Sequence, residues 1–247
     1  MYTLKQITFL LIPLVTTTSV LGQPKHFEPS IASFPSLNLD TLAKYQALSD
    51  EYHRIINEDV PFDNLTKTQK KLFENELLHS AGPYSTEELG CSWYCAAGIS
   101  QLRSTTQLDS TKSISYKPEN AHDFDLRTAW IEGKPGYGIG EEISIGFELL
   151  SNLKVTHIDV YNGYCKSRKV WKDNSRVKTF TLYANNELLG YLHLSDTYQR
   201  QRFDIGSLGG DSEGKLELRL KIANIYEGDK YMDTAISEIN FDGTGDH

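Results

Sequence analysis

Two stretches in the C-terminal part of the chain decide its fold. Residues 120–130 read NAHDFDLRTAW, and residues 233–239 read DTAISEI. In the first, two acids stand two residues apart and Thr128 follows three residues later, a spacing that makes a tight turn with carboxylate and carbonyl oxygens facing one point. Calcium takes six to eight such oxygens. In the second, Glu238 lies among inward-facing apolar residues of a predicted last strand, where a buried carboxylate needs a partner. Together they predict a metal that ties the first loop to the last strand.

Between these stretches the sequence has the pattern of a mostly β protein. From Cys91 onward, short runs of alternating apolar and polar residues replace helical spacing, and turn formers such as Asn162-Gly163 separate them. Short strands with no helices between them predict an antiparallel β-sandwich or barrel. The predicted strands cover residues 142–149, 155–161, 177–183, 188–194, 201–205, 216–222 and 235–241.

The N-terminal third divides into three parts. Lys5, an apolar run too short to span a bilayer, and small residues before Gln23 predict a signal peptide over residues 1–22. Residues 23–35 read as a linker or extended arm. Apolar residues then recur every three to four positions from Leu39 to Ile56, and a second helical face follows, which predicts a helical hairpin within residues 36–90. The predicted domains are therefore 1–22, 23–90 and 91–247.

Composition limits the partners and the location. The chain of 247 residues is 39% hydrophobic and 23% charged, as in ordinary globular proteins. Its net charge of −8, which becomes −9 without Lys5, argues against nucleic-acid binding and allows peripheral membrane contact at most. Cleavage near Gly22-Gln23 predicts a secreted, periplasmic or cell-surface protein. Export permits a disulfide, and Cys91–Cys95 is the favoured pair of the three cysteines, with a zinc site as the rival.

We find no sequence signature of a familiar enzyme. The chain lacks Gly-x-Ser-x-Gly, His-Glu-x-x-His and a phosphate-cradling Gly-rich loop before a helix. The sequence therefore predicts a protein that is not an enzyme. An enzyme with an unfamiliar site remains the alternative.

Several blocks together resemble a known family. They are TAWIEG from Thr128, YNGY from Tyr161, NSRVK from Asn174 and the run from Tyr226 to Glu238. In order and spacing, over roughly residues 91–243, they resemble the NADase-type glycan-binding domain of the galactose-binding-like superfamily, which includes discoidin and coagulation-factor C domains. The namesake domain precedes a secreted bacterial NAD glycohydrolase, whose catalytic domain has no counterpart among these blocks.

This resemblance implies a jelly-roll sandwich with a structural Ca²⁺. The implied ligands are side chains of Asp123 or Asp125, the hydroxyl or carbonyl of Thr128, carbonyls near Ala121, and Glu238. Phe124 stands where the family often has Gly, and Phe does not readily adopt positive φ. The departure leaves two alternatives, a turn that is altered or has lost its metal, and a turn that is retained.

The resemblance also implies a ligand site on loops at one end of the sandwich. Sugar sites combine an aromatic platform with planar hydrogen-bonding groups. Tyr164 and Trp171 are expected to be exposed. The competing interpretation gives Trp130 to the core, Asn162-Gly163 to a turn, and Asn174 and Arg176 to a structural network with Glu132 or Asp159. The candidate ligand-binding residues are Trp130, Glu132, Tyr137, Asn162, Tyr164, Arg168, Trp171, Asn174 and Arg176.

The sequence as a whole predicts an exported, lectin-like carbohydrate-binding module. Its expected partner is a glycan or a glycosylated surface component. The main alternative is a protein-interaction or adhesion module without a sugar site.

Overall fold

The computed structural model describes residues 23–31, 38–74, 84–86, 93–150 and 152–245. The predicted signal peptide and the Cys91–Cys95 disulfide lie outside the described residues and side chains. Within the described ranges, no helix has both the length and the apolar character needed to cross a bilayer.

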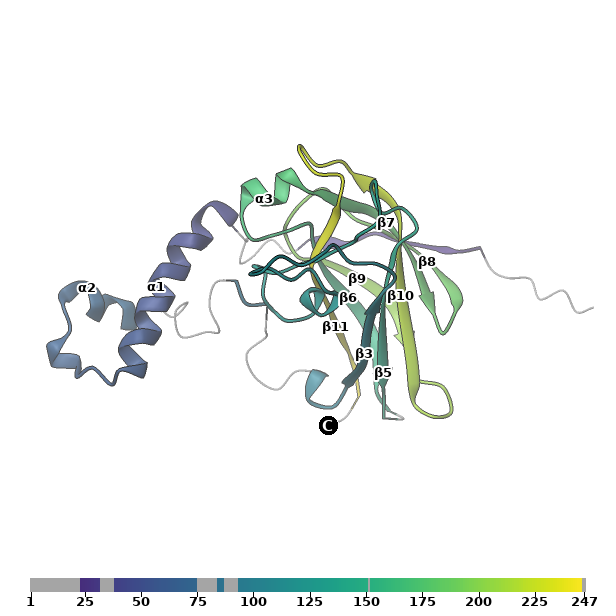
Figure 1. Ribbon diagram of the computed structural model, residues 1–247. Helices are drawn as coiled ribbons and strands as arrows, with labels where there is room; N and C mark the ends of the chain where they lie inside the picture. Colours follow the sequence, from purple (N-terminus) through teal and green to yellow (C-terminus); the bar gives the residue numbers. More distant parts are fainter. Residues whose placement is uncertain (1–22, 32–37, 75–83, 87–92, 151, 246–247) are drawn as a thin grey trace, which may run out of the picture.

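A helical region stands beside a β-sandwich (Figure 1). Helix α1, Leu39–Asn57, begins where the Asn38 side chain accepts the N–H of Asp40 at 3.1 Å, a regular N-cap. It confirms the helix predicted from Leu39 to Ile56. The short elements η1 (Phe62–Asn64), α2 (Lys67–Lys70) and η2 (Lys71–Glu74) return along it and bury Ile55, Leu65 and Leu72 in a small separate core.

The sandwich has two layers that belong to one hydrogen-bonded path. Strands β8, β7, β10, β5 and β3 form one layer, and β9, β6 and β11 form the other. The layers meet where β11 runs parallel to the start of β7, with Thr234 opposite Ser175 and Ala235 opposite Arg176. The strands are β3 (Gly98–Ser104), β4 (Trp130–Ile131), β5 (Glu142–Glu148), β6 (Lys154–Asn162), β7 (Ser175–Ala184), β8 (Glu187–His193), β9 (Gln201–Leu208), β10 (Lys215–Tyr226) and β11 (Thr234–Thr244).

Alternation of apolar residues builds the core, as the sequence predicts. In β5 the buried residues are Ile143, Ile145 and Phe147, and in β10 every second residue from Leu216 to Ile222 is buried. Side chains from both layers meet in one cluster. All seven predicted strands are confirmed within a few residues of their predicted bounds.

The structure departs from the sequence interpretation at three places. Residues 23–35 were expected to be a linker or arm, but Lys25–Phe27 (β1) and Ser30–Ile31 (β2) pair with β8 and β9 and so extend the sandwich beyond the predicted boundary at residue 91. Strand β3 has no clear alternation and was missed. Helix α3, Arg168–Asp173, lies between β6 and β7 where a loop was expected; it starts because the Ser167 side chain accepts the N–H of Val170.

Candidate functional site

The turn at residues 120–130 and the last strand meet, as predicted. The Oε1 atom of Glu238 accepts main-chain N–H groups from Asp123 at 3.2 Å and from Asp125 at 3.0 Å. Strand β4, which follows the turn, pairs with β11 two residues before Glu238. The turn is therefore held against β11 by two sets of hydrogen bonds: those from its N–H groups to Glu238, and those between β4 and β11.

Several oxygen atoms converge on the Thr128 hydroxyl. Its Oγ1 lies 2.9 and 2.8 Å from the two carboxylate oxygens of Asp123, 3.0 Å from the carbonyl oxygen of Asp125 and 3.4 Å from that of Asn120. The Asp125 carboxylate points elsewhere, because the Arg127 side chain donates to both its oxygens at 2.6–3.0 Å. Of the two acids, Asp123 contributes a side chain to the cluster and Asp125 contributes its main chain.

Glu238 is the most unusual carboxyl group in this cluster. It is fully buried, and its Oε2 atom accepts no hydrogen bond from the described residues, but its protonated side chain is hydrogen-bonded to Asp123. Burial, followed by the charge of Asp123, raises the pKa of Glu238 to about 9. The Glu238 and Asp123 carboxyl groups, the Thr128 hydroxyl and the two carbonyls that this hydroxyl contacts form an all-oxygen donor set of the kind that Ca²⁺ takes. No three His, Cys, Asp or Glu side chains gather as metal ligands in the described ranges, so most donors here would be hydroxyl and main-chain oxygens.

Phe124 adopts the positive φ that the sequence analysis considered difficult for this residue. Its φ is +60°, the left-handed conformation in which Gly is usual. The ring packs edge-on against Tyr94, at 5.7 Å between centroids, and against His122 at 4.9 Å. Aromatic contacts thus accompany a strained backbone conformation at this position.

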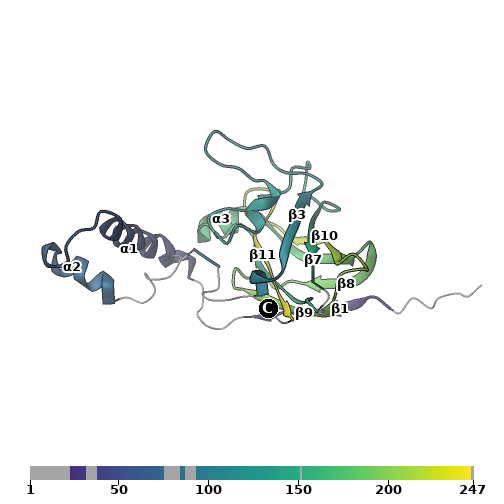
Figure 2. The same cartoon turned by 90° about the horizontal axis from the view of Figure 1, so that it is seen from below.

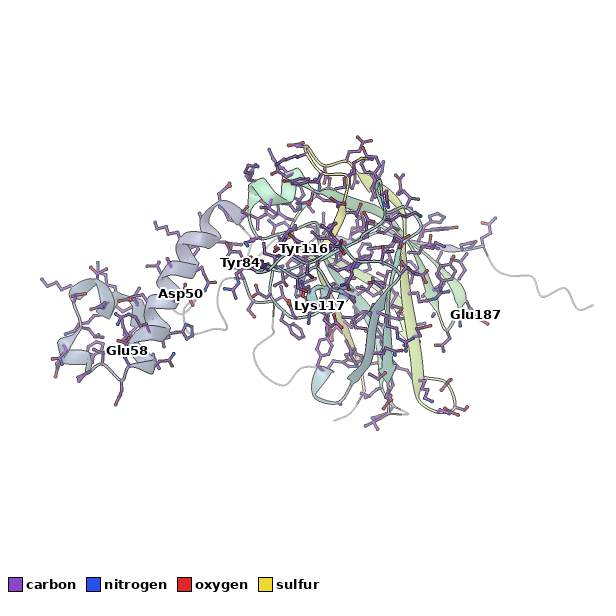
Figure 3. All side chains as sticks on the ribbon, in the orientation of Figure 1. Asp50, Glu58, Tyr84, Tyr116, Lys117 and Glu187 are labelled. Carbon is purple, nitrogen blue, oxygen red and sulfur yellow. The ribbon has the colours of Figure 1, made fainter. Side chains whose placement is uncertain are left out.

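A cleft of about 260 Å³ opens over this turn. Tyr84 lies where α1 approaches the sandwich (Figure 3), and Arg127 lies over its ring at 5.7 Å. The turn is therefore reached through a cleft that is lined mainly by polar and charged residues. Its lining residues are Gln46, Tyr84, Ser85, Asp123, Phe124, Asp125 and Arg127.

Three of the candidate ligand-binding residues are structural. Trp130 is fully buried and donates its indole N–H to the carbonyl of Thr106 at 3.0 Å. Glu132 is also buried, accepting the N–H groups of Lys134 and Thr234, and burial raises its pKa. The Asn162 side chain bonds both the N–H and the carbonyl of Val177, at 3.0 and 2.7 Å. The interpretation of Trp130 as a core residue is correct. The side chain of Asn162, at the end of β6, joins this strand to β7.

The expected exposure of Tyr164 and Trp171 is wrong. Tyr164 is 6% exposed and Trp171 is 8% exposed. Helix α3 turns Trp171 inward, where its indole N–H donates to the carbonyl of Asn162 at 2.8 Å and the Arg176 guanidinium lies 4.4 Å from its ring. Arg176 is 6% exposed and bonds Asp196 at 2.7 Å, so the network that was predicted with Glu132 or Asp159 is made with Asp196 instead.

The first turn of α1 covers this same surface. Leu39 and Leu42 pack with Trp171 and the buried Cys165. Arg168 is half-exposed and donates to Asp40 at 2.9 Å, while Asn174 is buried and donates to the carbonyl of Val170. Amphipathic periodicity shows that α1 has an apolar side, but it does not show that this side packs on α3.

Exposed aromatic and apolar side chains occur instead on two adjoining loops, 132–141 and 227–233. Tyr231 is 42% exposed, Met232 50% and Ile139 47%. The loops are linked because the Thr234 hydroxyl donates to the carbonyl of Tyr137 at 2.9 Å, and the Tyr137 hydroxyl bonds Glu227. In these two loops, Tyr137 and the buried Glu132 were the residues predicted as ligand-binding. Tyr231 and Met232 were missed although they stand together in a polar turn, a signal that could have found them.

Comparison with known proteins places the chain in a family. Residues 93–242 match the NAD glycohydrolase translocation F5/8 type C domain. No curated protein matches the chain.

Solved structures with a similar fold are remote in sequence. The carbohydrate-binding module CpGH89CBM32-5 from Clostridium perfringens, in complex with GalNAc-β-1,3-galactose, is 13% identical over 57% of this chain and 94% of that one, with a TM-score of 0.39. CBM32-3 from a family 31 glycoside hydrolase of the same organism is 13% identical over 61% and 92%, with a TM-score of 0.40.

A third similar structure is much larger. The arabinofuranosyltransferase AftD from mycobacteria is 10% identical over 59% of this chain, with a TM-score of 0.40, and the matching part spans 11% of AftD. The family match covers more than half of this chain. The chain therefore belongs to the family of NAD glycohydrolase translocation F5/8 type C domains.

Proposed function

We propose that this protein is an exported, calcium-stabilised, non-catalytic module that binds a glycan on the loops 132–141 and 227–233. The observation that carries the proposal is the exposure of Tyr231, at 42%, whereas the predicted aromatic residues Trp130, Tyr164 and Trp171 are buried. Fold and family favour a binding module for glycan or protein. The chemistry of these two loops supports a glycan as the ligand.

The two loops combine the groups that a sugar needs. A pyranose presents an apolar C–H face to an aromatic ring and hydroxyls to charged or amide groups. Tyr231 supplies the ring, and the Lys230 ammonium lies 4.6 Å from its centroid. Tyr137 and Glu227 add a hydroxyl and a carboxylate from the two loops.

Calcium would be held by oxygens of the turn and of β11. The carboxylates of Asp123 and Glu238, the Thr128 hydroxyl and the carbonyls of Asn120 and Asp125 are the donors. The ion would supply the positive charge that lets both carboxyl groups ionise, whereas without it burial and the charge of Asp123 keep a proton on Glu238. Ionised Glu238 would still fix the turn through the two main-chain N–H groups that it accepts.

Protein binding is the second candidate, and one observation favours it. Met232 and Ile139 are about half exposed beside Tyr231. Flexible apolar side chains such as Met suit a protein surface better than a sugar. The partner under this alternative is a surface protein without a required glycan.

The experiment is a glycan array probed with the full chain, with Ca²⁺ and with EDTA. Binding to a defined set of glycans that Tyr231→Ala reduces at least about tenfold supports the proposal, since aromatic anchors dominate binding sites of this kind. Tyr45→Ala is the matched control, because Tyr45 is 37% exposed on α1, away from the rim. A silent array together with capture of a protein partner that Tyr231→Ala or Met232→Ala abolishes would establish the second candidate instead.

A further inference from the structure

The segment Lys25–Ile31 is an arm that closes the sandwich along one side. Its first strand, β1, pairs parallel with β8, and its second, β2, pairs antiparallel with β9. Strands β8 and β9 belong to different layers, and each pairs with its own layer on its other side. Strand β1 lies at the end of the sandwich that is away from α1 and α2 (Figure 2). The arm therefore covers two edges whose unpaired N–H and C=O groups would attract other strands.

Gly190 on β8 is a notch that fits this arm. A Cβ atom at Gly190 would lie 2.3 Å from the carbonyl oxygen of Lys25 and 2.8 Å from the ring of Phe27. The three atoms nearest to that Cβ position all belong to the arm. Phe27 in turn packs against the main core of the sandwich. The arm can therefore pack against β8 only because residue 190 has no side chain.

A contact between two histidines joins the arm to β8. The Nδ1 atom of His26 lies 2.8 Å from the Nε2 atom of His193, and the two ring planes differ by 2°. The centroids are 5.1 Å apart, which equals the nitrogen–nitrogen distance plus about one ring radius on each side. The rings are therefore coplanar and edge to edge, with the two nitrogens pointing directly at each other.

Such a bond holds a single proton. A neutral imidazole has one N–H donor and one lone-pair acceptor, whereas both nitrogens of a charged imidazole are donors. The His26–His193 bond forms when one facing nitrogen carries a proton and the other does not. A second proton would place two N–H groups and two positive charges against each other. We propose that the His26–His193 pair is a proton-operated latch, which holds the arm when at least one ring is neutral and releases it when both are charged.

Several polar and charged groups lie near the His26–His193 pair. On the arm itself, Lys25 and Glu28 flank the pair with opposite charges. On β8, the Tyr191 ring is 5.2 Å from the His26 ring. On β7, the Thr179 hydroxyl is 3.5 Å from the Nδ1 atom of His193.

More distant charges lie on other strands. Along one row of the sheet, His26 is opposite Tyr191, Tyr191 opposite Thr181, and Thr181 opposite Lys221 on β10, so Lys221 is three strands away. On β9, Arg202 pairs with Asp159 and Asp242.

The test is hydrogen–deuterium exchange of residues 23–31 in the full chain, corrected for the intrinsic effect of pH. Imidazole is the side chain that ordinarily changes charge between about pH 5 and 8, so exchange is compared at about pH 7.5 and about pH 5. We expect exchange of the arm to rise at least about tenfold at the lower pH. Residues 216–222 in β10 serve as the internal control and should not change.

Two variants separate the latch from a general effect of acid. In His193→Gln the amide can occupy the place of Nε2 and stays neutral, so the arm should remain protected at both pH values. Gly190→Ala fills the notch and should free the arm at both. The proposal is overturned if the arm of the unmodified chain is equally protected at both pH values, or if His193→Gln shows the same rise in exchange.

Discussion

Glu238 on β11 accepts the main-chain N–H of Asp125 at 3.0 Å, across 113 residues of sequence. The same oxygen accepts the N–H of Asp123 at 3.2 Å. The other oxygen of Glu238 accepts no hydrogen bond from the described residues, and the Asp123 carboxylate is both its charged neighbour and its hydrogen-bond partner when Glu238 is protonated. The charge state of one side chain therefore decides how firmly the turn is held to the last strand.

Without divalent cations, the stability of the fold should decrease as pH rises. Burial and Asp123 raise the pKa of Glu238 from its ordinary 4.5 to about 9. Between these values the folded chain retains a proton that the unfolded chain has released. The contribution is therefore complete below pH 4.5 and is lost as pH passes about 9. The free energy of unfolding should fall by up to about 1.4 kcal/mol per pH unit in this window.

Urea unfolding in EDTA at about pH 6 and about pH 8 measures this slope. The Glu238→Gln variant cannot titrate at this position, so its free energy of unfolding should depend less on pH, by the slope attributed to Glu238. An equal slope in the variant would show that another group is responsible.

Calcium should raise the melting temperature of the unmodified chain and leave Glu238→Gln unchanged. Binding to the native state adds about 2.7 kcal/mol when the free ion is at one hundred times its dissociation constant. In EDTA the variant should be as stable as the unmodified chain at neutral pH, because its neutral amide replaces a protonated acid. Thermal unfolding with CaCl₂ and with EDTA measures both effects. The matched control is Glu187→Gln, an exposed acid at the start of β8 (Figure 3), which should behave as the unmodified chain does.

Binding of calcium should also release protons. Glu238 is protonated at neutral pH in the absence of a cation and must ionise to become a ligand. We expect about one proton released for each ion bound near pH 7.5, measured as the dependence of calorimetric binding heat on buffer ionisation. Calcium binding with no proton release would indicate that Glu238 is not a ligand.

Substitutions at Phe124 should reverse the usual ranking of Ala and Gly. The residue has φ of +60°, a conformation that costs a side chain about 1 kcal/mol and costs Gly little. Phe124→Ala loses the contacts to Tyr94 and His122 and keeps the strain, whereas Phe124→Gly loses the contacts and relieves the strain. Phe124→Gly should therefore unfold at higher urea concentration than Phe124→Ala. Equal midpoints would mean that the turn adopts another conformation in the variants.

Replacing Trp171 should cost stability and should not act as a test of ligand contact. The side chain is 8% exposed, packs with Leu39 and Leu42, and carries Arg176 on its face. Trp171→Ala should lower the free energy of unfolding by about 3–5 kcal/mol, as for other buried aromatic residues. Tyr231→Ala should change it by less than about 0.5 kcal/mol. Comparable losses in the two variants, measured by urea unfolding, would contradict this assignment of the core and the rim.

The sequence by itself determined the seven strands from β5 to β11 and the meeting of the turn with β11. A period of two in β5 and β10 is a local property of the chain, because successive side chains of a strand point to opposite faces. Glu238 within an apolar strand likewise indicated a buried carboxylate with a distant partner. These features depend on residue type and spacing, which are visible without coordinates.

The tertiary structure decided which side chains are exposed at the rim. Exposure depends on what packs on a residue from elsewhere in the chain. Trp171 stands in a polar run, yet α3 turns it inward and α1 covers it. The arm at residues 25–31 is too short for a periodic pattern, and it forms strands because β8 and β9 supply hydrogen-bonding edges and Gly190 leaves room. Contacts between distant segments have no local signature, so they appear only when the chain has folded.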